Sequence, residues 1–308
     1  MAPNRFFSNL SNLKLFNRSS FRVKFPDAFL TTVFLSLNVY IQRVAKGAMS
    51  DEIMPMSSDY GLRRHPRYAS LMLRDKLVEC YERGITSAHG LIAHGRGEAF
   101  DYLLGEQTSE SARKATKVAC AHLLAARCPV LSVNGNTATL VPDEIAELHA
   151  ITGIPVEVNL FHPSAQRIKK IADHLRAYGV ANVLTGFDFI KLAHIASDRA
   201  NIDKNGIFKA DVVFVPLEDG DRAQALTELG KTVLAVDLNP LSRTAMTSTV
   251  TIVDEVTRAL KNIVSFAKHF QGDGHPDELS LLKASFDNRE NLKASYAVMQ
   301  KRLRSLSR

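Results

Sequence analysis

The feature that most constrains this chain is a series of short apolar runs separated by segments of helical length. The runs cover residues 129–133, 155–160, 182–184, 211–217, 232–238 and 249–253. The helical segments between and after them cover residues 143–151, 164–178, 222–229 and 255–270. This alternation is typical of βα units, which build a parallel sheet with helices on both faces. The sequence therefore predicts an α/β fold with a Rossmann-like, mainly parallel sheet and flanking helices.

A helical segment precedes the predicted sheet, and a helical tail follows it. Apolar residues at three- and four-residue spacing predict helices over 70–83, 97–104 and about 109–126, with Gly84 and Gly105 as the ends of the first two. Residues 276–308 are expected to form one long helix. We expect a leader over 1–49, a single α/β domain over 50–272 with a helical part over 64–126, and a C-terminal helical tail over 273–308.

The positive charge of the chain is concentrated at its start. The net charge is +7, and residues 1–49 carry seven Lys and Arg against one acid, Asp27, so the rest is nearly neutral. Phosphate-backbone binding requires clustered Lys and Arg, and a neutral body lacks them. We therefore expect no nucleic-acid partner.

The leader contains no predicted membrane span, and the cysteine pattern indicates a reducing compartment. The apolar run over 28–40 is too short to cross a bilayer, so we expect no membrane partner. Met49 resembles a natural start, and residues 1–48 are interpreted as an over-extended reading frame or a disordered leader. Cys80, Cys120 and Cys128 are odd in number and have no C-x-x-C spacing, which excludes a disulfide framework and indicates a cytoplasmic protein.

Two glycine motifs resemble nucleotide signatures but fail on inspection. Gly95-Arg96-Gly97 lacks the third glycine of the dinucleotide fingerprint and no predicted strand precedes it. Gly230-Lys231-Thr232 lies between a helix and a strand, which is the wrong order for a P-loop, and Gly230 is interpreted as a helix C-cap. His89 and His94 have no carboxylate at ligand spacing, so a zinc site is not expected.

Polar residues follow three of the predicted strands, where an open α/β sheet binds its ligands. They are Asn134-Gly135-Asn136-Thr137, Glu218-Asp219-Gly220-Asp221-Arg222 and the segment from Asp237 to Thr244. Turns favour the same residue types, so a single cluster of this kind is more often a turn than a site, and it is the three clusters together with two arginines that suggest a ligand pocket. Arginines bind phosphates and the aspartates suit Mg²⁺ or ribose hydroxyls, a combination that favours phosphoryl or nucleotidyl transfer.

Several long strings closely resemble the archaeal 4-phosphopantoate–beta-alanine ligase family, also called phosphopantothenate synthetase. They are HPRY (65–68), LRDKLVE (73–79), GLIAHGRGEAFDYLLGE (90–106), SVNGNTATLVP (132–142), EVNLF (157–161), VPLEDGDR (215–222) and VDLNPLSRTA (236–245). The resemblance covers residues 62–270, with the leader and the tail after about 275 outside it. It implies a homodimeric, ATP- and Mg²⁺-dependent ligase of coenzyme A biosynthesis. Such an enzyme joins 4-phosphopantoate to beta-alanine and releases AMP and diphosphate, by analogy through an acyl-adenylate.

The resemblance also implies roles for individual residues. Arg74 and Arg96 would bind the ATP phosphates, and the nucleotide would be held by Glu218, Asp219, Gly220, Asp221, Arg222, Asp237, Leu238 and Asn239. Arg96 and His94 are candidate catalytic residues, with a buried, hydrogen-bonded histidine as the alternative for His94. The alternative for Arg74 is a surface pair with Asp75 or Glu79.

Six further residues are hypothetical substrate ligands. Asn134, Asn136 and Thr137 are expected to face phosphopantoate, and Ser242, Arg243 and Thr244 are expected to bind a phosphate. A nicotinamide- or nucleotide-binding reductase or kinase of the same pathway remains the alternative function, since it would share the α/β sheet. The metal ligands stay open.

Overall fold

The computed structural model describes residues 63–306 except 187, 193–194, 196–197 and 273–275, so the expected leader lies outside the described residues. Residues Arg67–Arg308 form one compact unit. A six-stranded sheet runs through it in the order β3-β2-β1-β6-β7-β8, with every pairing parallel. The strands are β1 (Pro129–Val133), β2 (Val156–Val158), β3 (Val183–Leu184), β6 (Val212–Pro216), β7 (Thr232–Val236) and β8 (Val250–Ile252). The predicted fold class is confirmed.

Both faces of the sheet are covered because its central strands are apolar on both sides. Along β6, Val212 and Phe214 belong to one buried cluster, while Val213 and Val215 belong to another. The first cluster includes residues of α5 (Glu110–Ala125), α7 (Pro142–Thr152), α8 (Ala165–Ala177) and α11 (Val256–Gly272). The second includes α9 (Gly220–Glu228) and the segment holding the antiparallel pair β4 (Phe189–Lys191) and β5 (Asn201–Asp203), with the 3₁₀ turn Asp198–Ala200.

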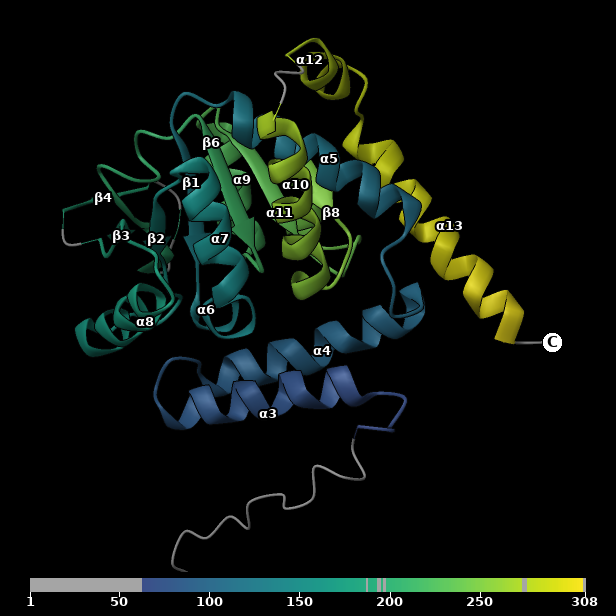
Figure 1. The fold of residues 1–308 in the computed structure, drawn as a ribbon, viewed down its shortest axis with the longest axis horizontal. Coiled ribbons are helices and arrows are strands. Elements are labelled where there is room, and N and C mark those ends of the chain that lie inside the picture. Colours follow the sequence, from purple (N-terminus) through teal and green to yellow (C-terminus); the bar gives the residue numbers. More distant parts are fainter. Residues whose placement is uncertain (1–62, 187, 193–194, 196–197, 273–275, 307–308) are drawn as a thin grey trace, which may run out of the picture. The chain divides into compact units, whose positions relative to one another are not determined.

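Two helices of the N-terminal segment lie beyond the carboxyl ends of the strands. α3 (Tyr68–Glu82) packs against α4 (Ala88–Leu104), and α4 lies between α3 and the sheet (Figure 1). Ser87 caps α4 by accepting a hydrogen bond from the Gly90 amide. The expected start of this helix at 97 was wrong, because glycines that disfavour a helix locally are accommodated here by packing against the rest of the domain.

Three short helices were missed or merged in the sequence prediction. α6 (Gly135–Leu140) and α10 (Arg243–Thr247) were expected as polar loops. The tail forms two helices, α12 (Pro276–Ala284) and α13 (Asn288–Leu306), instead of one. Asp287 interrupts the helix, since its carboxylate accepts the amides of Arg289 and Glu290 as an N-terminal cap.

The three cysteines are free thiols, with Cys80 and Cys120 buried and Cys128 exposed. Burial raises the pKa of the Cys120 thiol to about 12. None of the helices in the described part of the chain is both long and apolar enough to cross a membrane.

Candidate functional site

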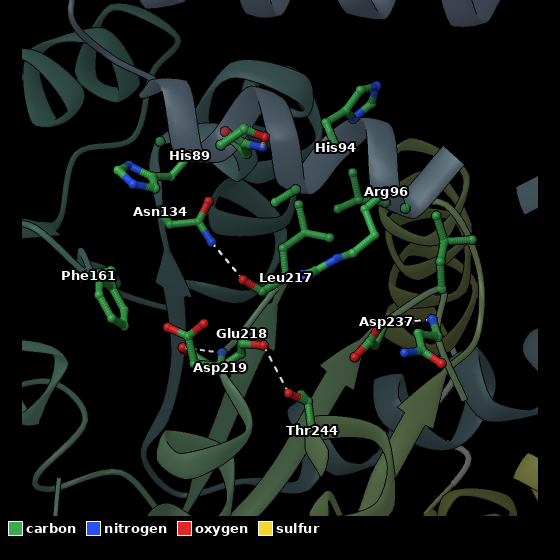
Figure 2. A pocket seen from close by; sticks show the side chains of 18 of the residues that line it. His89, His94, Arg96, Asn134, Phe161, Leu217, Glu218, Asp219, Asp237 and Thr244 are labelled. Atoms are coloured by element: carbon green, nitrogen blue, oxygen red, sulfur yellow. Dashed lines mark hydrogen bonds between the residues drawn. The ribbon is translucent and has the colours of Figure 1, made fainter. Parts of the chain in front are cut away.

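A cleft of about 600 Å³ opens at the carboxyl ends of β1, β6 and β7. The chain leaves β1 toward β2 and β3 on one side and returns to β6 on the other, so β1 and β6 mark the topological switch point of the sheet. Open α/β sheets bind ligands at this point. α4 crosses over the cleft and contributes lining residues to it (Figure 2). Of the seventeen predicted site residues, thirteen line the cleft and Arg74, Thr137, Asp221 and Arg222 do not.

The polar side chains after β1 form hydrogen bonds with other groups of the protein. Asn134 donates from Nδ2 to the Leu217 carbonyl (2.9 Å) and caps α6 by accepting the Thr137 amide. Asn136 donates to the Gly90 carbonyl (2.7 Å) and accepts from the Thr86 hydroxyl. Thr137 is buried and donates to the Pro216 carbonyl (3.2 Å). These three side chains join α4, α6 and β6, and their polar atoms already have protein partners.

The chain turns sharply where β6 ends. Leu217 has a φ of 58°, a left-handed conformation that is rare for a branched residue. Its carbonyl is held by Asn134, and its amide donates to the Val236 carbonyl (3.1 Å). Backbone strain of this kind persists only where surrounding contacts enforce it, and it is concentrated at functional sites. The turn directs the next residue, Glu218, into the cleft.

An ionic group underlies the cleft: Arg199, Glu218 and Asp219 line it, and the fully buried Arg222 joins them through Glu218. We call these four residues the cleft floor. One oxygen of Glu218 pairs with Arg199 and the other pairs with Arg222. Arg199 also pairs through Nε with Asp219 (2.7 Å). Burial raises the pKa of Asp219, and Arg199 opposes that rise. The Glu218 carboxylate is therefore occupied by two guanidinium groups, which leaves it no free oxygen for a ligand.

Two of the predicted nucleotide ligands do not reach the cleft. Arg222 is fully buried inside the first turn of α9, where Nη1 also donates to Ser132 (3.2 Å) and Nε and Nη2 have no hydrogen-bond partner. Asp221 accepts the amide of Arg222 and does not line the cleft. Because α9 starts at Gly220, its helical turn directs residues 221 and 222 away from the ligand side.

The polar side chains after β7 also form hydrogen bonds with other groups of the protein. Asp237 accepts the Asn239 amide (2.9 Å) and the Ser242 hydroxyl, and Ser242 caps α10. Burial raises the pKa of Asp237, while these hydrogen bonds and the positive charge of Arg96 oppose the rise. Thr244 is buried and donates to the Glu218 carbonyl (2.9 Å) (Figure 2). Leu238 also lines the cleft.

Gly220 is required by the arrangement of Arg243. A Cβ atom on Gly220 would lie 2.5 Å from the Cβ of Arg243, which no side chain tolerates. The Arg243 stem thus packs directly on the start of α9, and its guanidinium remains exposed at the cleft. This contact brings a positive charge beside the N-terminus of a nine-residue helix, which itself favours anions.

Arg96 and His94 project from opposite sides of α4. In Figure 2, Arg96 points from α4 toward the strand ends, while the ring of His94 points away from them. His94 lies 4.0 Å from Glu98, its Nε2 has no hydrogen-bond partner, and burial lowers its pKa. Its neutral ring is therefore not directed at the strand ends where a substrate would lie.

Arg74 reaches α4 from α3. Its Nε donates to both oxygens of Glu98 (3.0 Å each), and neither Asp75 nor Glu79 is its partner. Ser70 donates to the same carboxylate (2.5 Å). The Glu98 carboxylate raises the pKa of Arg74, and Arg74 and Ser70 hold the pKa of Glu98 below its usual value despite burial. This cluster joins α3 to α4.

The sequence analysis did not predict several of the lining residues as site residues, among them the aromatic and basic side chains of His89, Phe161, His162, Arg167 and Arg199. Phe161 and His162 follow the second predicted strand directly, so the rule applied to the other three strand ends would have found them. Arg167 and Arg199 lie in α8 and the 3₁₀ turn, and no local pattern marks them.

Three arginines at the cleft have no carboxylate partner among the described residues: Arg96, Arg167 and Arg243. We call them the unpaired arginines. Since a guanidinium binds phosphate or carboxylate oxygens bidentately, the cleft can hold a ligand with several anionic groups. Within the described residues, no group of three or more His, Cys, Asp or Glu side chains could bind a metal ion without help from a ligand.

Comparison with known proteins identifies relatives of this chain. A family model described as phosphopantothenate/pantothenate synthetase matches residues 111–302. The 4-phosphopantoate–beta-alanine ligase of Methanosarcina mazei is 47% identical over 243 residues, which cover 79% of this chain and 95% of the relative. The ligase of the same name from Methanospirillum hungatei is 54% identical (68% of this chain, 85% of the relative), and that of Thermococcus kodakarensis is 46% identical (79% and 93%). The family match extends to residue 302, so the expectation that the tail lies outside it was wrong.

Proposed function

Because this chain belongs to the phosphopantothenate/pantothenate synthetase family, we propose that it is an ATP-dependent ligase that joins 4-phosphopantoate to beta-alanine, as its relatives' names state for them. The observation that carries the proposal is the cleft at the switch point, which has three unpaired arginines and a closed ionic floor. The products are 4′-phosphopantothenate, AMP and diphosphate, and the pathway is coenzyme A biosynthesis.

The reaction proceeds in two steps. A carboxylate oxygen of phosphopantoate attacks the ATP α-phosphorus, forming an acyl-adenylate as the bond from the α-phosphorus to the bridging oxygen breaks and diphosphate leaves. The beta-alanine amine, after losing a proton, attacks the acyl carbon and AMP leaves. Both steps develop negative charge on oxygen, which fixed cations stabilise best when they are already oriented. Arg96 and Arg243 are such cations near Asp237 and the start of α9, where we assign the nucleotide.

The assignment changes the roles of several predicted residues. Asn134, Asn136, Ser242 and Thr244 are positioning residues, since their side chains hold the walls of the cleft. Arg243 moves from the substrate phosphate to the nucleotide, because it packs on Gly220. Arg74 acts through Glu98.

The donor set fits a magnesium ion carried by the nucleotide. Asp219 lines the cleft, and of its two carboxylate oxygens only Oδ2 is engaged by a described residue, in the pair with Arg199 (2.7 Å). Mg²⁺ commonly takes one or two carboxylates together with substrate phosphates and water. When bound, the ion would neutralise phosphate charge, and Asp219 is the residue that would hold it.

The proposal also includes a homodimer in the cytoplasm with no nucleic-acid or membrane partner. Light scattering on the full chain tests the oligomeric state, and a mass near 68 kDa is expected since one chain weighs 34.0 kDa. A mass near that of one chain would contradict the dimer.

AMP release by the full-length protein tests the reaction. The assay contains ATP and Mg²⁺, and omits phosphopantoate or beta-alanine in turn. Repeated turnover to AMP is expected only when both are present. AMP formation without beta-alanine beyond one equivalent, or none from the complete mixture, would contradict the proposed ligase. A reductase or kinase would instead oxidise a nicotinamide or release ADP.

A further inference from the structure

Strand β2 buries a carboxylate on a largely apolar face of the sheet. Glu157 is 1% exposed, and its neighbours along the strand, Val156 and Val158, belong to the buried cluster on the opposite face. On the face that Glu157 shares, the central strands contribute Val130, Val213 and Val233. A carboxylate buried among apolar residues costs free energy unless hydrogen bonds compensate it, so the partners of Glu157 indicate what it does.

The partners of Glu157 are two backbone amides of one loop. Its Oε1 accepts the Asp203 amide (3.1 Å), and its Oε2 accepts the Ile207 amide (2.8 Å). The loop closes tightly around the carboxylate, since a Cβ atom on Gly206 would overlap Oε2. Both oxygens of Glu157 therefore hold the segment 203–207, which begins at the last residue of β5.

A second side chain, directly after β2, holds the other end of β5. Asn159 lies two residues beyond Glu157 and therefore on the same face of the sheet. It is buried, and its Nδ2 donates to the Asn201 carbonyl (2.8 Å). Since β5 runs from Asn201 to Asp203, Asn159 holds its first residue and Glu157 holds its last. We call Glu157 and Asn159 the β2 clamp.

The segment that the β2 clamp holds carries Arg199 into the cleft. The 3₁₀ turn that contains Arg199 ends at Ala200, directly before β5, so Arg199 is two residues from the carbonyl that Asn159 holds. Arg199 lines the cleft and pairs with both carboxylates of the cleft floor, Glu218 and Asp219. The position of β5 on the sheet therefore sets the position of this guanidinium relative to the end of β6.

The antiparallel pair β4 and β5 does not fix this position by its own pairing. In the described part of the chain it is a sheet of two strands, and β4 is largely exposed. A two-stranded pair of this length is at best marginally stable alone. Ile202 and Ile207 bury apolar surface against the large sheet, but apolar burial has no direction. The hydrogen bonds of the β2 clamp are directional, so they determine where β5 lies.

We propose that Glu157 and Asn159 are positioning residues of the ligation reaction, which act through β5 and Arg199 to orient the carboxylates of the cleft floor. The proposal rests on the ligase function above. A misplacement of about 1 Å caused far from the chemistry can slow a reaction about 100-fold. Neither residue of the β2 clamp lines the cleft, so its loss removes no contact with a substrate. Such a loss lowers kcat and leaves the KM values nearly unchanged.

Steady-state kinetics of the full-length Asn159→Ala and Glu157→Gln variants test the proposal. The assays run at a temperature at which circular dichroism shows each variant to be folded. We expect kcat for AMP formation to fall about 10-fold in each variant, while KM for ATP, phosphopantoate and beta-alanine changes less than about 3-fold. Asn159→Ala removes a single hydrogen bond, so it carries the test if Glu157→Gln does not fold.

A double-mutant cycle separates positioning through Arg199 from general destabilisation. Arg199→Gln should itself lower kcat, and adding Asn159→Ala to it should cause no further loss, because the guanidinium that Asn159 positions is already absent. The matched control is Asp211→Asn. The Asp211 carboxylate also accepts two backbone amides, those of Arg127 and Cys128, but it precedes β6 at the opposite end of the sheet. This control should keep the kcat of the wild type.

Several outcomes would overturn the positioning role while leaving the ligase intact. They are an unchanged kcat in the variants of the β2 clamp, an equal loss of kcat in Asp211→Asn, and a rise in KM for one substrate at constant kcat. An equal factor for Asn159→Ala in the wild-type and Arg199→Gln backgrounds would overturn it as well, since the two side chains would then act independently. A wild type that forms no AMP from the complete mixture would refute the ligase, and the positioning role with it.

Discussion

The cleft floor and the unpaired arginines use the same side chain in opposite ways. In the floor, Arg199 and Arg222 are buried and share the two oxygens of Glu218. At the cleft walls, Arg96 and Arg243 are exposed and have no carboxylate partner among the described residues. A paired, buried arginine orders the chain around it, whereas an unpaired one at a cleft retains its charge for a ligand. The ion pairs of an arginine therefore indicate its role better than its proximity to a strand end does.

The largest expected effect is on stability, from Glu218→Gln. The substitution removes the ion-pair partner of the fully buried Arg222 and leaves Arg199 with Asp219 alone, which should lower the free energy of unfolding by about 3–5 kcal/mol. Chemical denaturation measures it. The control is Glu147→Gln, which breaks a half-exposed pair with Lys268 and should cost less than about 1 kcal/mol. Equal effects of both substitutions would contradict the structural role of the floor.

Arg96→Ala should show the reverse pattern. We expect kcat/KM for ATP to fall about 100-fold because a cation oriented toward the reacting phosphates is lost. The melting temperature should stay within about 2 °C of the wild type, since Arg96 has no ion pair to lose. The control is Arg127→Ala, which removes an arginine that is 92% exposed at the opposite end of β1. A large fall in melting temperature with Arg96→Ala would mean that Arg96 stabilises the fold, as the arginines of the cleft floor do.

The fold could be predicted because its signal is local. Runs such as 211–217 are apolar on both faces, and that pattern identifies a strand covered on two sides. The prediction failed where the deciding contact is distant in sequence. Gly90 lies inside a helix that packs on Asn136, 46 residues away, and no pattern within α4 indicates that partner.

The location of the site was also predictable, whereas the roles of its residues were not. Strand ends in a parallel sheet meet at one edge, so the three polar clusters correctly indicated the cleft. Within the clusters, a polar side chain that binds the protein looks the same in sequence as one that binds a ligand. Thr244 is an example, because its hydroxyl donates to the Glu218 carbonyl 26 residues away. Unpaired charge becomes visible only when all neighbours are known.

Glu157 should make the free energy of unfolding depend on pH. It is buried in β2, where it accepts the amides of Asp203 and Ile207. Burial raises its pKa to about 7, against the opposing effects of these amides and the charge of Arg222. The folded state then keeps a proton that the unfolded state releases between about pH 4.5 and 7. Stability from this group is complete below that window and falls as the pH rises through it, by at most about 3 kcal/mol.

Denaturation of the wild type and Glu157→Gln at pH 5, 6, 7 and 8 measures this term. The difference in unfolding free energy between the two proteins should shift in favour of the variant as the pH rises, and should become constant above pH 7. A difference that does not change with pH would mean that Glu157 is ionised throughout. Glu157 would then be a charged carboxylate like those of the cleft floor, and not a protonated carboxyl.

The smallest expected effect tests whether Arg74 belongs with the paired or the unpaired arginines. Its pair with Glu98 is 41% and 13% exposed, so solvent screens it, and Arg74→Met should lower the free energy of unfolding by no more than about 1 kcal/mol. If Arg74 acts through Glu98 by holding α3 against α4, Glu98→Gln should change KM for ATP by the same small factor, and the double variant should add nothing. If Arg74 instead binds an ATP phosphate directly, Arg74→Met should raise KM for ATP about 10-fold or more while Glu98→Gln does not. The two arginines that the family resemblance grouped together, Arg74 and Arg96, would then differ only in having a carboxylate partner in the absence of the nucleotide.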